Sequence, residues 1–261
     1  NFVGTDITGT VDLGNDHEGI DLSEGTHDNR VIHNLVSGND YDGIGLQGYN
    51  NAQFPTPPIQ THDNLIERNI IGLDINLGPL PNTRHGVAIG EYGPSRWGCA
   101  DRNTVRENVI AFNGGDGVAV VEDWIDTVNA DGNLITENAI WANGGLGIDL
   151  ENNGVTPNDP FDMDVGANRE LNFPVITSVA YNAGITTITG TLGIDTNPAN
   201  AVVEVFQAQV DPSGFGEGEL FIGRAIPDAA GNWSMRTDRL VPSDFVTTTA
   251  TDMLNNTSEF S

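Results

Sequence analysis

The stretch that decides the fold reads Asn103-Thr-Val-Arg-Glu-Asn108-Val-Ile-Ala-Phe-Asn113, and it continues to Gly117-Val-Ala-Val120. Asn recurs at every fifth position, and a β-branched residue follows two places after Asn103 and Asn108. An amphipathic helix does not explain the pattern, because Gly and Asn are poor in helix interiors. Copies run from Asn29 to Leu46, from Asn64 to Ile89 and from Asn133 to Leu150, and a partial copy ends at Leu22.

Each copy predicts one coil built from short strands. Apolar residues spaced by two point to one face of a strand, which here is the inside of the coil. Asn suits the corners, because it tolerates left-handed backbone and hydrogen-bonds to its own chain. Stacked coils place Asn above Asn, so that the side-chain amides form a ladder along the axis. The sequence therefore predicts a stack of parallel coils over residues 1–150.

The second half of the chain has a different pattern. Residues 151–172 form an acidic connection rich in Asp, Asn and Pro. Strand-forming segments follow at 186–192, 201–206 and 245–251, and clusters of Gly, Pro and Asn separate them. Short strands at this spacing predict a β-sandwich of immunoglobulin-like type over residues 173–261.

The repeat resembles the parallel β-helix repeat of extracellular bacterial proteins. The second half is similar to the module that follows such helices, through Asn168-Arg-Glu-Leu-Asn-Phe-Pro174, Asp211-Pro-Ser-Gly-Phe-Gly-Glu-Gly218 and Ala230-Gly-Asn-Trp-Ser. The resemblance implies an all-β fold, a right-handed parallel β-helix followed by an immunoglobulin-like β-sandwich, outside the cell or on its surface. Proteins of this kind include polysaccharide lyases, epimerases and glycosidases, but also surface proteins without known activity. The architecture therefore does not decide the chemistry.

Charge limits the partners of the chain. The formal net charge is -27, and every basic residue is Arg. Such a surface repels nucleic acid and anionic lipid and attracts divalent cations. No stretch approaches the roughly 20 apolar residues of a membrane-spanning helix. We expect self-association, other surface proteins or a polysaccharide as partners, without nucleic acid binding or membrane insertion.

The acidic connection contains a candidate calcium site. Asp159, Asp162, Asp164 and Asn168 surround Gly166. Oxygen side chains that alternate around a Gly turn suit a hard cation such as Ca²⁺, which here would fix the angle between the two halves. The alternative is a solvated linker whose Asp side chains cap turns.

A second candidate site lies on the coils. When the copies are aligned on their Gly, Asp42, His85 and Asp116 fall in one column, and Arg84 lies one position earlier. Carboxylates beside His and Arg suit acid–base chemistry on an acidic sugar. The alternative is that Asp-Gly and His-Gly only form turns.

Three insertions leave the coils at the same point and predict a third site. They carry Tyr49, Tyr92, Trp97 and Trp124. Exposed aromatic rings suit sugar rings or a protein partner. The alternative is that these rings pack the insertions onto the coils.

Three hypotheses about function remain at this point. The leading one is a non-catalytic extracellular structural or adhesive surface protein, with a filament built through the helix ends as one form of it. This form is suggested by the first coil, which starts at Phe2 without a helix that would cap it. The alternative is that residues before Asn1 supply the cap. The alternatives are a polysaccharide lyase or epimerase that uses the column, and a glycan-binding protein that uses the aromatic insertions. Whether the chain is an enzyme is left open, with the balance toward no, because it has no Lys to serve as a base.

Overall fold

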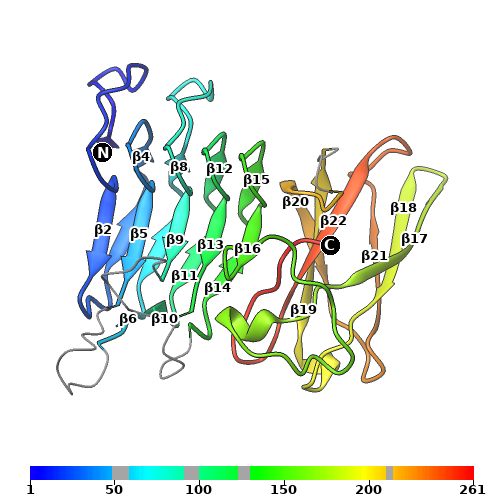
Figure 1. Ribbon diagram of the computed structural model, residues 1–261. Coiled ribbons are helices and arrows are strands. Elements are labelled where there is room, and N and C mark those ends of the chain that lie inside the picture. The colour runs from blue at the N-terminus through cyan, green and yellow to red at the C-terminus, as the bar shows by residue number, and fades with distance from the viewer. Residues whose placement is uncertain (49–58, 91–99, 123–129, 210–213) are drawn as a thin grey trace.

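The computed structural model describes residues 1–48, 59–90, 100–122, 130–209 and 214–261, and it is all-β. Parallel sheets occupy the first half and antiparallel sheets occupy the second, and the two halves lie side by side (Figure 1). The predicted all-β class with both kinds of sheet is confirmed.

In the first half, complete copies of the repeat contribute one strand to each of three parallel sheets. The first sheet contains β1 (Phe2–Val3), β4 (Leu35–Val36), β8 (Ile70–Ile71), β12 (Val109–Ala111) and β15 (Ala139–Trp141). The second contains β3 (Arg30–Ile32), β7 (Leu65–Glu67), β11 (Thr104–Arg106) and β14 (Leu134–Thr136). The third contains β2 (Ile20–Ser23), β5 (Ile44–Gln47), β9 (Val87–Ile89), β13 (Val118–Val120) and β16 (Ile148–Leu150). A short parallel pair, β6 (Thr61–His62) and β10 (Ala100–Asp101), lies beside them.

The register places equivalent residues of successive copies directly above one another. Val105 pairs with Ile66 of the preceding copy and with Ile135 of the following copy. All three side chains are buried in one hydrophobic cluster that fills the inside of the coils. The spacing of the apolar residues therefore defines the core, as predicted.

The predicted Asn ladder is present. Oδ1 of Asn108 accepts hydrogen bonds from N and Nδ2 of Asn69 at 2.9 and 3.0 Å. N and Nδ2 of Asn108 donate in turn to Oδ1 of Asn138 at 3.0 and 2.9 Å. Ladders follow three corners, through Asn29, Asn64, Asn103, Asn133 and Asn168, through Asn1, Asn34, Asn69, Asn108 and Asn138, and through Asn15, Asn39, Asn82, Asn113 and Asn143.

One detail of the corners differs from the prediction. Apart from Asn168, which has a φ of 46°, the ladder Asn residues do not take the left-handed backbone, which falls instead on the residue before them at several corners. Arg68, Glu107 and Glu137 have φ values of 54°, 54° and 55°. The reason is that the Asn amide bonds the main chain of the neighbouring coil, and the preceding residue makes the bend. The Asn side chains make the hydrogen bonds, and the residues before them adopt the strained backbone conformation.

The second half consists of two antiparallel three-stranded sheets. One has the order β17 (Val175–Asn182), β18 (Ile185–Thr191) and β21 (Asn232–Thr237). The other has the order β20 (Gly218–Ala225), β19 (Val202–Ala208) and β22 (Phe245–Thr251). Short 3-10 turns occur at Ala167–Glu170 and Pro198–Asn200. The three strand-forming segments of the sequence lie on β18, β19 and β22, and a second hydrophobic cluster that includes Ile188 and Trp233 joins the sheets.

The interior of the coils continues into the second half. Phe206 of β19 and Phe260 belong to the coil cluster, and their rings meet edge to face at 5.4 Å. A Cβ atom at Gly147 of the last coil would lie only 2.8 Å from the Phe260 ring. The C-terminal segment returns to lie between the coils and the sheets (Figure 1). Two Phe rings thus close the interior of the coils at the end of the last coil.

Candidate functional site

The column predicted from the repeat is assembled in the structure. Oδ1 of Asp42 accepts a hydrogen bond from the main-chain N of His85 at 2.9 Å. Nδ1 of His85 lies 3.0 Å from both the main-chain N and Oδ2 of Asp116. A neutral ring accepts the N–H, and a protonated ring pairs with the carboxylate. Oδ1 of Asp116 accepts from the main-chain N of Leu146 at 2.7 Å. Each side chain therefore bonds the coil that follows it.

The column is buried. Asp42 is 2% exposed, and His85 and Asp116 are each 5% exposed. Burial raises the pKa of the Asp42 carboxyl, although the charges of Arg84 and His85 oppose the shift. Nη1 of Arg84 lies 3.6 Å from Oδ2 of Asp42, and its guanidinium lies 4.0 Å over the ring of Tyr41. Arg84 is the most accessible group of the predicted set, with 27% of its side chain exposed.

The arrangement of the column has a sufficient structural explanation. Three polar side chains accept three main-chain N–H groups of successive coils, just as the Asn amides do at the corners. Such contacts satisfy donors that would otherwise be buried without a partner. The column is thus a fourth ladder, and acid–base chemistry is not needed to explain its residues.

The predicted aromatic site falls outside the residues that the structure describes. Tyr49, Tyr92, Trp97 and Trp124 all lie in the gaps of the described chain. Their role in binding stays a prediction.

The predicted metal site is assembled in part. Carboxylate oxygens of Asp159, Asp162 and Asp164 all lie within 4.8 Å of one another. Burial raises the pKa of Asp162 to about 6. Burial, and then the charge of Asp159, raises the pKa of Asp164. Like charges held close together in this way are stabilised by a hard cation, for which carboxylates are the preferred ligands.

Asn168 does not join these carboxylates. It is fully buried, and its Oδ1 accepts from the main-chain N of Asn133 at 2.9 Å. Its Nδ2 donates to the main-chain O of Asn133 and of Thr257 at 2.8 and 3.1 Å. Asn168 therefore continues an Asn ladder. The negative charge of these carboxylates acts instead on Glu170, whose pKa is raised by burial and then by the charge of Asp164.

The last coil meets a set of acceptors that the sequence analysis missed. Glu204 of β19 accepts from Oγ1 of Thr136 at 2.6 Å and from the main-chain N of Glu137 at 2.9 Å. Glu217 accepts from N and Nδ2 of Asn143 at 3.3 and 3.0 Å. Further acceptors for this coil are Asn256, Thr257 and Glu259. These side chains take the place of the coil that would otherwise come next. We call them, with Asn168, the cap.

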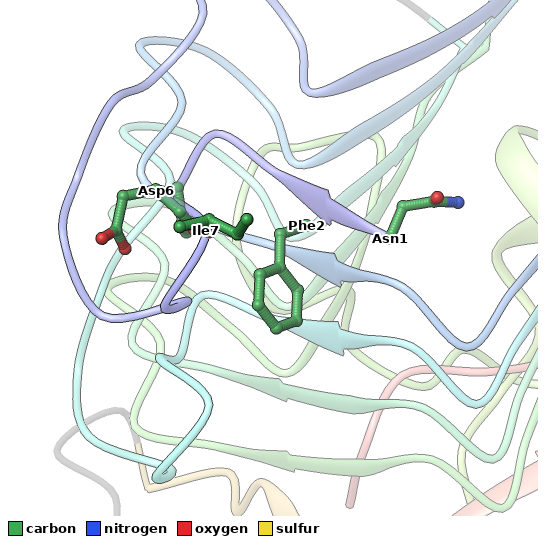
Figure 2. A pocket seen from close by; sticks show the side chains of 5 residues that line it. Asn1, Phe2, Asp6 and Ile7 are labelled. Atoms are coloured by element: carbon green, nitrogen blue, oxygen red, sulfur yellow. The ribbon is translucent and has the colours of Figure 1, made fainter.

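The first coil shows the opposite situation. Strands β1, β2 and β3 are the outer strands of the three parallel sheets. Oδ1 of Asn1, Asn15 and Asn29, one at each corner, accepts no hydrogen bond from another described residue. Phe2 and Ile7 are 43% and 93% exposed beside this edge. Both line an open cavity of about 520 Å³. Figure 2 shows their side chains beside β1 and the loop that follows it. The outer strands, the three amide oxygens and the exposed side chains of Phe2 and Ile7 thus lie at the same end of the coils. We call this surface the open coil edge.

Within the described ranges, no helix has the length and apolar character that a membrane span requires. Neither a scan against models of protein families nor a search of the curated proteins found a match for the chain.

Proposed function

We propose that the chain is a non-catalytic structural or adhesive protein of the extracellular surface. In this proposal the three parallel sheets form a right-handed parallel β-helix and the two antiparallel sheets form an immunoglobulin-like sandwich. The observation that carries the proposal is the difference between the two ends of the coils. One end is closed by the cap, and the other presents the open coil edge. Unpaired strand edges are templates for further strands, so this end suits contact with a further coil.

The open coil edge favours one kind of partner. Its three corner amides offer acceptors, which match the N–H groups on the opposite edge of another coil. In this chain that opposite edge is covered by the cap. Identical chains therefore have no free edge at the last coil on which another copy could stack head to tail. We therefore propose that the edge receives a coil that does not carry such a cap, and we do not propose the head-to-tail filament.

The buried column supports a non-catalytic role. Asp42, His85 and Asp116 are each committed to a main-chain N–H group. A general acid or base needs access to the proton of its substrate, at hydrogen-bond distance or through one water. The alternative function, lyase or epimerase activity on an acidic polysaccharide, would have to use Arg84 and Tyr41 at the surface of the column.

A panel of uronic-acid polymers tests the non-catalytic proposal. We expect no unsaturated products by absorbance and no new reducing ends, because the acid–base groups of the column are buried. The contradicting result is turnover by the wild type that disappears in Arg84→Gln and persists in Arg236→Gln. Arg236 lies on β21, far from the column in the fold, and serves as the matched control.

We also propose that calcium binds Asp159, Asp162 and Asp164 and stiffens the connection between the halves. Asp162 already holds the end of this connection, because its Oδ1 accepts from the main-chain N of Asn172 at 2.7 Å. Its Oδ2 accepts from the main-chain N of Asp195 at 3.4 Å. A cation on the same carboxylates would hold these segments together and offset their repulsion.

The pH dependence of stability follows from the raised pKa values. Burial raises the pKa of Asp149 and Asp162 to about 6 and that of Glu259 to about 7. Between the lower pKa values of the unfolded chain and these values, the folded chain binds more protons. The free energy of unfolding therefore falls as the pH rises from about 4 to 7, by on the order of a few kcal/mol. Asp63 and Asp228 have lowered pKa values and act oppositely, but both are at the surface, where solvent screens their charges.

Calcium should reverse part of this loss. Urea unfolding at pH 7 is expected to give a higher midpoint with 1 mM CaCl₂ than with EDTA, and the gain should vanish near pH 4.5, where Asp162 is protonated. Asp162→Asn should abolish the gain, and the exposed Asp238→Asn should keep it. An equal calcium effect in both variants would contradict the proposed site.

A further inference from the structure

Strand β17 is an open edge in the second half of the chain. It is the outer strand of its sheet and pairs only with β18 among the described residues. In Figure 1 it lies on the side of the molecule away from the coils. Seven of its eight residues are exposed. A strand of this length leaves a row of main-chain N–H and C=O groups without partners.

The side chains of β17 also lack a cover. Residues directly opposite in an antiparallel pair share one face of the sheet. Val179 lies opposite Ile188, and Tyr181 lies opposite Thr186. Ile188 is 0% exposed in the cluster between the sheets, and Thr186 is 2% exposed and donates to the main-chain O of Leu240. Val179 and Tyr181, in contrast, are 48% and 47% exposed. The inner face of the sheet therefore continues onto β17 beyond the area that the rest of the second half covers.

The charge pattern distinguishes this edge from the rest of the chain. No Asp, Glu, Lys or Arg occurs from Leu171 to Ile194, although the whole chain has a formal net charge of -27. Natural sheet edges are usually protected by charges or Pro. Strand β17 has neither, and only a register shift between Ile176 and Ser178 interrupts it. It is a long uncharged edge on a strongly acidic protein.

We propose that β17 pairs antiparallel with β17 of a second copy of this chain, so that the two sheets become one across a twofold axis. Two acidic chains repel each other over most of their surfaces, and an uncharged strand is where they can approach at the lowest electrostatic cost. The pairing satisfies the free main-chain groups of both strands, and it lets the apolar side chains of each copy cover those of the other. This interface is separate from the open coil edge and does not depend on it.

Sedimentation velocity over a concentration series tests the proposal. We expect a monomer–dimer equilibrium that strengthens in 0.5 M NaCl, because salt screens the repulsion between the copies. Val179→Asp should raise the dissociation constant at least tenfold, because it places like charges on both sides of the axis and removes apolar cover. Ile226→Asp is the control, because it changes an apolar residue that is 61% exposed and lies beyond the end of β20.

Two further variants keep the test independent of folding. Ala180→Pro removes one main-chain N–H and restricts the backbone of the strand. Tyr181→Asp repeats the charge test at another position. Thermal unfolding shows whether each variant is folded. A monomer at all concentrations, or a dimer that folded Val179→Asp and Tyr181→Asp leave unchanged, overturns the proposal. A dimer that survives these variants and is lost on Phe2→Asp assigns the contact to the open coil edge instead. The polysaccharide panel and the calcium effect are read on the monomer and do not change with either result.

Discussion

Asn108→Ala is expected to lower the free energy of unfolding by roughly 3 to 5 kcal/mol. The substitution leaves N and Nδ2 of Asn69 without their acceptor on Asn108. It also removes one of the two donors to Oδ1 of Asn138 and the side-chain donor to the main-chain O of Ile66. All of these groups are buried, and each buried polar group without a partner costs about 1 to 3 kcal/mol, less than additively. Urea unfolding followed by circular dichroism measures the loss.

Asn76→Ala is the matched control, because Asn76 is exposed in a loop. We expect its free energy of unfolding to remain within about 0.5 kcal/mol of the wild type. If Asn108→Ala loses no more than Asn76→Ala, the corner amides do not hold the coils together.

Phe260→Ala should be of similar size, with a loss of roughly 3 to 5 kcal/mol. The ring is 4% exposed and packs on Phe206 and on Gly147 of the last coil. Its removal leaves a cavity at the point where the coil interior meets the second half, and the surrounding main chain is too constrained to fill it. The same urea experiment measures the loss.

Phe245→Ala provides the comparison, because Phe245 is 57% exposed on β22. It should lose far less than Phe260→Ala. Equal losses in the two variants would mean that Phe260 is an ordinary surface ring and that the coils and the sheets do not share a core.

The sequence predicted the coils well because each copy of the repeat has the same spacing of Asn and apolar residues. Val105, Ile66 and Ile135 occupy equivalent positions, so their common column followed from alignment alone. The same logic placed Asp42, His85 and Asp116 together. Alignment gives position along the coil, but it does not give exposure. The commitment of these side chains to main-chain donors became visible only in three dimensions.

The cap was missed because its residues are distant in sequence from the coil they touch. Glu204 bonds Glu137, and Glu259 bonds Leu150, through contacts that no local pattern encodes. One signal was present, since Glu204 interrupts an apolar run in Val-Val-Glu-Val-Phe, and a charged residue at such a position needs a buried partner. The sequence pattern placed Asn168 in the calcium site, although the number of residues from Asn133 to Asn168 resembles the number between earlier ladder residues. The irregular linker concealed the continuation of the ladder.

Hydrogen exchange measured by mass spectrometry tests the central claim most directly, because the claim is that the coils are closed at one end and open at the other. The amides of β16 should exchange as slowly as those of the interior strand β9, because the cap covers the last coil. The amides of β2 should exchange faster than both at low protein concentration. Exchange of β16 at the rate of β2 or faster would contradict the account, because the second half would then not close the coils.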